Sequence, residues 1–93
     1  MWKVSETRVI QKIIGKAPNE IQEEYEAWKE LVRTSGPLSL REFPGYRDHA
    51  LKGEWLGARS SSLNIKWRVI YVVRADQIEV LVLNLTPHDY RRK

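Results

Sequence analysis

The strongest constraint on the fold is a run of strand-like segments in the second half of this 93-residue chain. From residue 58 to residue 85 the apolar residues follow period two, the repeat of a β-strand rather than of a helix. The segment 67–74 alternates most clearly, with one face made of Trp67, Val69, Tyr71 and Val73. Short turns separate three such segments, so we expect an antiparallel meander of three strands.

The flanking strands of this meander differ in their pattern. In the first, Leu63 and Ile65 share one face, and the other face is polar, with Ser60, Ser62 and Asn64. The last strand, residues 77–85, is apolar on both faces: Leu81, Leu83 and Leu85 lie opposite Ile78, Val80 and Val82. A strand that buries both faces lies inside a sheet, so we expect the last strand to be central.

Two helices precede the meander. The first has an apolar face at helical spacing, Val9, Ile10, Ile13 and Ile14, and Ser5 is expected to cap its start. The second covers about residues 18–34, with the stripe Ile21, Tyr25, Trp28 and Val32. An aromatic stripe at this spacing indicates core packing. A helical turn is possible at 38–42.

These patterns predict an α+β fold. A short N-terminal strand at 2–4 leads into a two-helix hairpin, which packs on an antiparallel sheet that ends in the three-stranded meander. The length is that of a single domain over 1–93. The chain has no cysteine, no apolar run of transmembrane length and no signal-peptide pattern, so we expect a cytoplasmic protein that does not enter a membrane.

The net charge of +4 is unevenly placed along the sequence. Residues 1–46 hold seven basic and seven acidic residues, whereas residues 47–93 hold nine basic and five acidic ones. The stretch 48–71 interleaves Lys52, Arg59, Lys66 and Arg68 with Trp55 and Trp67. Cations that can meet phosphates beside flat rings that can meet bases favour a nucleic-acid partner. A basic but merely soluble surface is the alternative.

Two strings within this stretch resemble a known family. Leu51-Lys52-Gly53-Glu54-Trp55-Leu56-Gly57-Ala58-Arg59, followed seven residues later by Trp67-Arg68-Val69-Ile70-Tyr71, is similar to the RelE/ParE superfamily of bacterial toxins. The likeness is to its RelE/StbE mRNA-interferase group, with features of the YafQ-like branch. The ending Thr86-Pro87-His88-Asp89-Tyr90 also resembles that group.

The resemblance implies the toxin of a type II toxin–antitoxin system, an endoribonuclease that cuts mRNA, usually in the ribosomal A site, and so inhibits translation. It implies no metal and no cofactor, and a cognate antitoxin as partner. A ParE-like toxin that acts on DNA gyrase, or a plain RNA-binding module, are the alternatives. His88-Asp89-Tyr90 after the last strand, which could transfer protons, and the basic meander both argue against the gyrase toxin.

Metal-free RNA cleavage needs a base for the 2′-OH proton, cations for the phosphate and an acid for the leaving 5′-oxygen. We expect His88 and Tyr90 to serve in proton transfer and Arg68 and Arg59 to act on the phosphate; His49 could also lie near the site. The RNA-binding residues that we expect are Lys52, Lys66, Trp67 and Arg91, although packing is the more natural role for Trp67.

The chain departs from the YafQ-like branch at two positions. That branch typically has Asp where this chain has Lys66 and His where it has Ser62. The chemistry therefore resembles the RelE-type solution, in which Lys, Arg and Tyr do most of the work, with His88 added. Two distant histidines and no cysteine do not make a zinc pattern.

Overall fold

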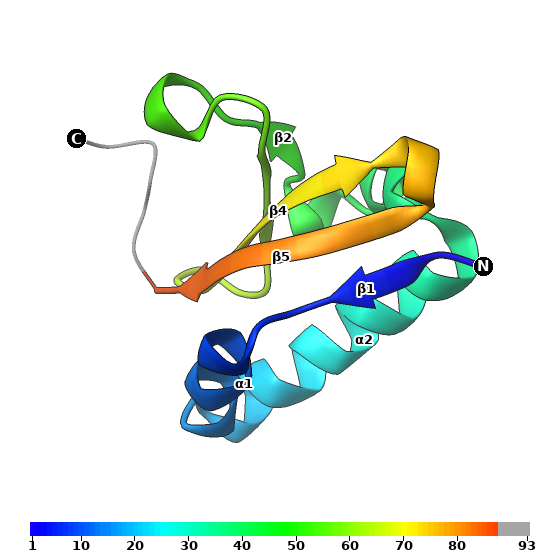
Figure 1. Cartoon of the computed structure of the whole chain (residues 1–93). Helices are drawn as coiled ribbons and strands as arrows, with labels where there is room; N and C mark the ends of the chain where they lie inside the picture. The colour runs from blue at the N-terminus through cyan, green and yellow to red at the C-terminus, as the bar shows by residue number, and fades with distance from the viewer. Residues whose placement is uncertain (88–93) are drawn as a thin grey trace.

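A five-stranded sheet carries two helices on one of its faces (Figure 1). The structure is a computed structural model that describes residues 1–87. Across the sheet the strand order is β1-β5-β4-β3-β2. The strands are β1 (Lys3–Ser5), β2 (His49–Ala50), β3 (Arg59–Ser62), β4 (Arg68–Arg74) and β5 (Glu79–Thr86). The predicted α+β fold and the β3–β4–β5 meander are confirmed, and β5 is an interior strand as expected.

The N-terminal strand makes the sheet mixed. β1 runs parallel to β5, whereas every other neighbouring pair is antiparallel. A parallel neighbour needs a long crossover, and here the whole of the intervening chain supplies it. β1 therefore pairs with the edge of β5 that β4 leaves open, and β5 becomes an interior strand.

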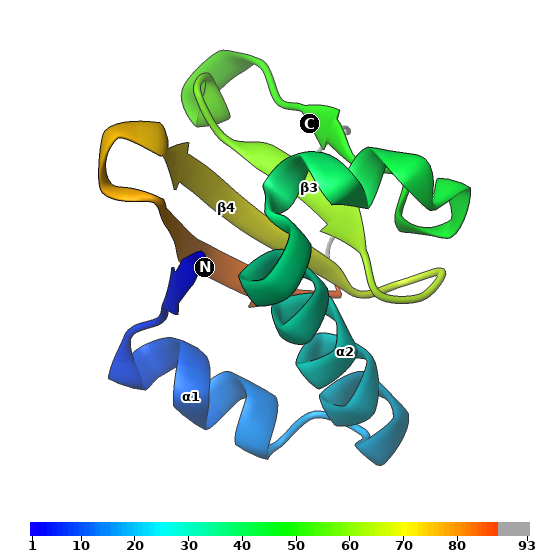
Figure 2. The same cartoon turned by 90° about the vertical axis from the view of Figure 1, so that its right-hand side faces the viewer.

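The helices α1 (Arg8–Gly15) and α2 (Asn19–Ser35) lie together on one face of the sheet (Figure 2). The predicted stripe of α2 is confirmed, because all four of its residues are fully buried: Ile21, Tyr25, Trp28 and Val32. Trp28 meets the Tyr71 ring of β4 edge-on, with centroids 5.3 Å apart. Four short 3₁₀ turns complete the described chain: η1 (Pro37–Glu42), η2 (Pro44–Tyr46), η3 (Gly53–Trp55) and η4 (Ala75–Gln77).

The start of α1 was predicted wrongly. Thr7, not Ser5, caps this helix, since its hydroxyl accepts a hydrogen bond of 3.3 Å from the Ile10 amide. Ser5 belongs to β1 and donates its hydroxyl proton to Glu79 of the neighbouring strand. The apolar face of α1 is also narrower than expected, because Val9 is 64% exposed.

Two details of the meander also differ from the prediction. β3 ends at Ser62, and Ile65 lies in the following turn, 84% exposed. In β5 the register with β4 shifts, so that Ile70 faces Asn84 but Tyr71 faces Val82. This bulge places Leu85 in the core with Val80 and Val82 instead of with Leu83. None of the helices in residues 1–87 has the length and apolar character to cross a membrane.

Candidate nucleic-acid interface

The two faces of the sheet have different surroundings. Val69 and Tyr71 of β4 belong to the main core under the helices. Ile70 and Val72 point the other way, into a second cluster with residues of the β2–β3 loop. Figure 1 shows the helices below the sheet and this loop above it. We call the side of Ile70 the helix-free face.

Strand register assigns further residues to the helix-free face. One row across the sheet contains His49, Ser60, Ile70 and Asn84, and the next contains Ser62, Arg68 and Thr86. Partners in such a row project to the same side because side chains alternate along each strand. Apart from Ile70, these two rows are therefore polar, with one cation and one imidazole among hydroxyl and amide groups, and the apolar second cluster lies beside them on the same face.

Arg68 is the first residue of β4, and its side chain lies on this face. It is only 8% exposed, and its Nη1 donates to the carbonyl oxygens of Asn64 (3.4 Å) and Ile65 (3.2 Å). These bonds fix the guanidinium against the β3–β4 turn. A guanidinium has five N–H donors, and Nη1 supplies two of them. The remaining donors, on Nε and Nη2, have no hydrogen-bond partner in residues 1–87.

His49 enters the face from the edge strand β2. Its Nδ1 lies 2.7 Å from the Arg47 carbonyl oxygen. Because a carbonyl oxygen can only accept, Nδ1 carries the proton, and Nε2 of the neutral ring keeps its lone pair. Nε2 is buried and has no hydrogen-bond partner in the described chain. From standard strand spacing, the His49 and Arg68 Cα atoms are roughly 12 Å apart, a gap that a nucleotide can occupy.

The loop from Leu51 to Ala58 borders the helix-free face. Leu51 and Ala58 are buried against Ile70, and Trp55 packs beside them. Gly57 has φ +97°, a backbone region that favours glycine, so this residue lets the chain return to β3. Lys52 is exposed on the loop.

Arg59 lies on the other face, where it pairs with a buried carboxylate. Its Nε donates to Asp48 Oδ1 at 2.7 Å, and the Asp48 side chain is fully buried. Burial lowers the pKa of Arg59, but the hydrogen bond and the charge of Asp48 outweigh it and raise that pKa above its usual value. Arg59 and Arg68 thus stand on opposite faces of the sheet, which the sequence did not indicate.

Two more donors complete the environment of Asp48. Ser61 donates to Oδ2 at 2.7 Å, and the Tyr71 hydroxyl donates to the same oxygen. Burial, then the hydrogen bond and charge of Asp48, raise the pKa of Tyr71 well above its usual value. Sequence reasoning missed this cluster, because its residues are spread over three elements. The one available signal was an aspartate between a turn and a β-strand.

The remaining predicted residues are distributed as follows. Lys66 is exposed in the β3–β4 turn, and Trp67 packs partly buried against the main core. His88, Tyr90 and Arg91 lie outside the described residues, so their roles stay predictions. No group of three His, Cys, Asp or Glu residues within 1–87 could hold a metal ion.

Comparison with known proteins finds matches among solved structures. No family model matches the sequence, and no curated protein sequence matches it. YafQ from E. coli is similar over 100% of both chains, with a TM-score of 0.73 and 16% identity. A chain of the YoeB–YefM complex from Staphylococcus aureus covers 96% of this chain and 99% of its own, with a TM-score of 0.71 and 12% identity.

A third match is the toxin–antitoxin complex RelBE2 from Mycobacterium tuberculosis, with a TM-score of 0.67 and 19% identity over 91% of this chain and 95% of that one. This chain and the three matched chains therefore share one fold. The chain has the fold of the RelE/ParE toxin superfamily, as its sequence motifs predicted.

Proposed function

We propose that the chain is the toxin of a type II toxin–antitoxin pair and that it cuts mRNA as a metal-independent endoribonuclease on the ribosome. The observation that carries the proposal is the helix-free face, where a half-buried imidazole, whose Nε2 has no hydrogen-bond partner in residues 1–87, shares a surface with a fixed guanidinium. Likeness to YafQ over the whole of both chains supports the same choice.

The reaction needs no group beyond the RNA and the protein. The 2′-oxygen of a nucleotide attacks the adjacent phosphorus, and the bond from phosphorus to the 5′-oxygen breaks. The products are a 2′,3′-cyclic phosphate and a 5′-hydroxyl. One proton leaves the 2′-OH and one joins the 5′-oxygen, so a base and an acid are both required.

The helix-free face offers a candidate base and a cation for the phosphate, and the acid in this proposal comes from the chain beyond the described residues. His49 Nε2 is the base in this proposal, because its lone pair is free and its ring is held by the Arg47 carbonyl. Arg68 stabilises the phosphate, since a fixed and largely desolvated cation acts strongly on developing charge. His88 supplies the proton to the leaving oxygen, and Tyr90 assists proton transfer.

The other predicted residues hold the RNA or the scaffold. Lys52 and Lys66 are exposed and bind the RNA backbone, together with Arg91. Trp67 stacks on a base only with the part of its ring that the core leaves open. Arg59 stabilises the scaffold through its ion pair with Asp48 on the helix-bearing face of the sheet. A direct role of Arg59 on the phosphate stays a prediction.

An antitoxin is the expected protein partner. The structures named YoeB–YefM and RelBE2 are toxin–antitoxin complexes, and this chain shares the fold of their chains. We propose that a cognate antitoxin covers the cationic surfaces and blocks RNA.

The test is primer extension on a reporter mRNA in a cell-free translation system, beside the same RNA without ribosomes. His49→Ala, His88→Ala and Arg68→Ala are compared with Arg41→Ala, an exposed cation on η1. We expect discrete cuts in the reading frame only during translation. Each site variant should lower the rate by roughly 10²-fold or more, and Arg41→Ala should not.

A modified substrate separates the two histidines. When sulfur replaces the leaving 5′-oxygen, departure needs no proton, so loss of the acid is rescued and loss of the base is not. We expect rescue of His88→Ala and none of His49→Ala. Cuts on naked RNA would remove the ribosome from the proposal. Growth arrest with no cuts at all would favour the gyrase alternative, which a DNA supercoiling assay then tests.

A further inference from the structure

Three consecutive serines form most of β3, and they divide between the two faces of the sheet. Ser61 projects toward the helices and donates its hydroxyl proton to Asp48 at 2.7 Å. Ser60 and Ser62 project to the helix-free face, where they are only 3% and 7% exposed. Neither of these two hydroxyls makes a hydrogen bond within residues 1–87. We call Ser60 and Ser62 the hydroxyl pair.

The hydroxyl pair is an unusual choice for this strand. β3 lies between β2 and β4 in the interior of the sheet, where β-branched and aromatic side chains pack best. A nearly buried hydroxyl has little access to water, so leaving it without a partner costs stability. Of the unpartnered side-chain nitrogens and oxygens in residues 1–87, only Trp28 Nε1 and His49 Nε2 are fully enclosed, so both hydroxyl oxygens still reach the surface. They are therefore open to a ligand on this face.

The hydroxyl pair lies between the proposed base and the proposed phosphate cation. Ser60 is the cross-strand partner of His49, and Ser62 is the cross-strand partner of Arg68. Directly opposite residues have Cα atoms about 4.5–5.5 Å apart, and the two serines are about 7 Å apart along β3. Because serine is shorter than either flanking side chain, the hydroxyl pair forms the floor of the gap between His49 and Arg68.

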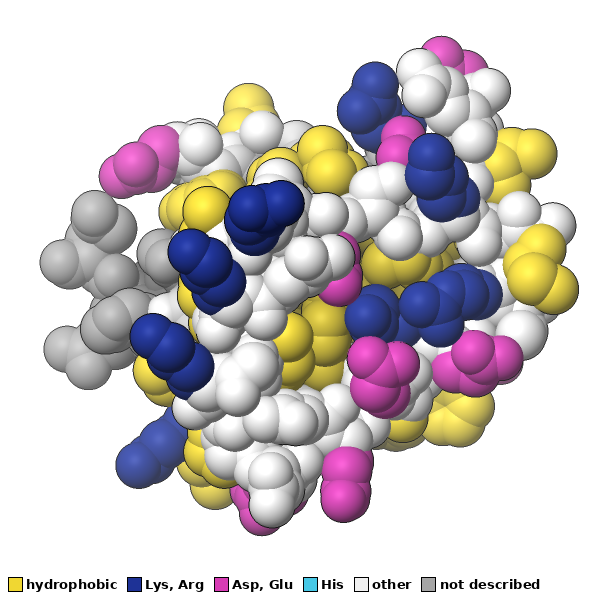
Figure 3. Space-filling model, turned by 60° about the horizontal axis from the view of Figure 1, so that its bottom comes forward, with side chains coloured by type: hydrophobic (Ala, Val, Ile, Leu, Met, Phe, Trp, Pro, Cys, Tyr) yellow, Lys and Arg dark blue, Asp and Glu magenta, His cyan; other side chains and the backbone are white. Residues whose placement is uncertain are grey.

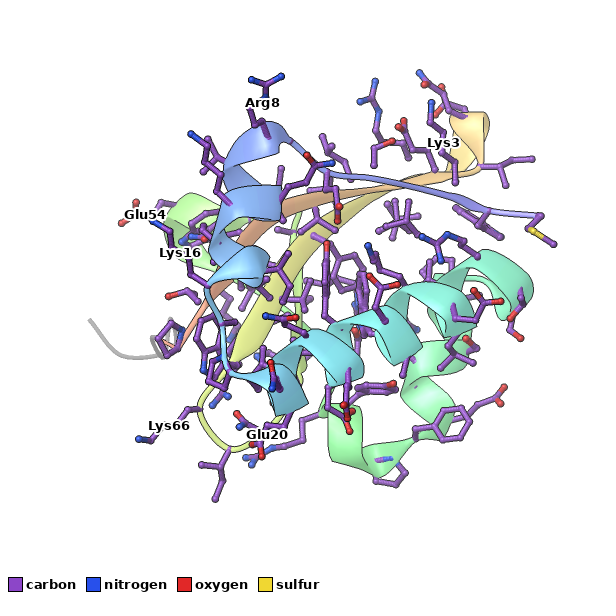
Figure 4. The ribbon with its side chains drawn as sticks, turned by 90° about the horizontal axis from the view of Figure 1, so that it is seen from below. Lys3, Arg8, Lys16, Glu20, Glu54 and Lys66 are labelled. Carbon is purple, nitrogen blue, oxygen red and sulfur yellow. The ribbon has the colours of Figure 1, made fainter. Side chains whose placement is uncertain are left out.

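The charges around this floor suit a phosphate. The two rows that contain the hydroxyl pair have no acidic residue, and Arg68 is their cation. Lys66, two residues before Arg68, projects outward from the β3–β4 turn (Figure 4). On the helix-bearing side acidic and basic side chains occur together (Figure 3), as in the pairs of Lys29 and Arg33 with glutamates. An anion is therefore favoured on the helix-free face.

We infer that Ser60 and Ser62 hold the scissile phosphate, each by donating its hydroxyl proton to a different non-bridging oxygen. An O–H···O hydrogen bond is about 2.7 Å long, so two donors about 7 Å apart can bracket one phosphate. Arg68 adds positive charge on the side of Ser62, and His49 faces the 2′-OH on the side of Ser60. The inference rests on the proposed function, because it assigns the floor of the same site.

The test compares Ser60→Ala and Ser62→Ala with Ser61→Ala, a matched control from the same strand and the opposite face. Loss of a hydrogen bond to a charged phosphate should slow cleavage of the reporter mRNA about 10- to 100-fold in Ser60→Ala and in Ser62→Ala. Ser61→Ala should cut within about threefold of the wild-type rate, because Asp48 keeps its two other donors. The thermal midpoint should show the reverse order, with a fall of about 4–8 °C in Ser61→Ala and of less than about 2 °C in the other two.

Sulfur substitution distinguishes contact with the phosphate from an indirect effect on the fold. Sulfur is a weak hydrogen-bond acceptor, so sulfur in place of either non-bridging oxygen at the mapped cleavage site should slow the wild type. A variant that lacks the hydroxyl for that oxygen has no such bond to lose. Ser60→Ala should therefore be insensitive to one phosphorothioate isomer and Ser62→Ala to the other, whereas Ser61→Ala should be slowed by both.

A strand that cannot be cut separates this inference from the proposed function. Single-stranded RNA with 2′-fluoro groups has no 2′-OH to attack the phosphate, and its binding should weaken about threefold or more in S60A/S62A and not in Ser61→Ala. If the wild type binds this strand but cuts no mRNA, the proposed function fails, and weaker binding by S60A/S62A still supports the phosphate contact. Wild-type cleavage by both Ser60→Ala and Ser62→Ala, or sulfur effects that persist in both, would overturn the inference and leave the proposed function standing.

Discussion

The Asp48 carboxylate shows how much one residue can organise in this fold. It is fully buried and accepts hydrogen bonds from Arg59, Ser61 and Tyr71, which belong to β3 and β4. It directly precedes His49, so it anchors the strand that carries the proposed base. A buried carboxylate is tolerated because three donors replace its lost hydration.

Replacement of this carboxylate should be costly. Asp48→Asn keeps the size of the side chain but leaves the Arg59 guanidinium, 23% exposed, without its counter-charge. We expect the free energy of unfolding to fall by about 2–4 kcal/mol, measured by urea denaturation. Glu26→Gln, which removes an exposed partner of Lys29, should change it by less than about 0.5 kcal/mol. A loss of similar size in both variants would show that the buried pair adds nothing special.

At the residue scale, the sequence indicates which side chains can take part in chemistry better than it indicates which side chains contact one another. Arg68 stood out because it is a cation within an apolar strand. Arg59 stood out as a cation of the family-like motif, yet the structure places it on the opposite face. The difference depends on strand register and on Asp48, which is eleven residues away in the chain. Residue type and spacing do not encode such a contact.

At the scale of elements, α2 and the meander were predictable because their patterns are long. The bulge in β5 was not, since one extra residue shifts every later side chain to the other face. Charge placement is a second example. The first half of the sequence is balanced in charge, but its acids lie mainly in α2, whereas α1 has two cations, Arg8 and Lys12, with a third, Lys16, at its C-cap.

The junction after α2 gives a test at this scale. Gly36 has φ +84°, and a Cβ there would lie 3.0 Å from Trp2 Nε1. Gly36→Ala should therefore lower the free energy of unfolding by about 1–3 kcal/mol. Gly15→Ala is the matched control: it lies in α1 with open space around it, and it should raise stability by about 0.5–1 kcal/mol. Urea denaturation measures both, and the same sign for both would contradict this reading.

For the whole molecule, two tyrosines of the core make hydrogen bonds to carboxylates. Tyr25 and Tyr71 are fully buried, and their hydroxyls donate to Glu6 and Asp48. Burial is the main reason that the pKa of each lies well above its usual value, and the neighbouring carboxylate adds to it. Both therefore resist ionisation while the chain is folded, so we expect the stability of the fold to fall at alkaline pH.

The sign of that dependence follows from proton binding. Above about pH 10 a tyrosine in the unfolded chain loses its proton, whereas Tyr25 and Tyr71 keep theirs in the folded chain. The folded state then binds more protons, so the free energy of unfolding falls as pH rises, by about 1.4 kcal/mol per pH unit for each tyrosine. Below pH 10 the stabilising contribution of the two protonated tyrosines is fully present.

Tyr25→Phe and Tyr71→Phe should each flatten the decline in the free energy of unfolding between pH 10 and 11.5, by about 1.4 kcal/mol per pH unit, in urea denaturation. Tyr46→Phe should do so less, because the Tyr46 pKa is raised by a smaller burial with a contribution from Glu24. If either core variant kept the full wild-type slope, that tyrosine would have to ionise within the folded protein, and the core around Trp28 would have to admit its charge.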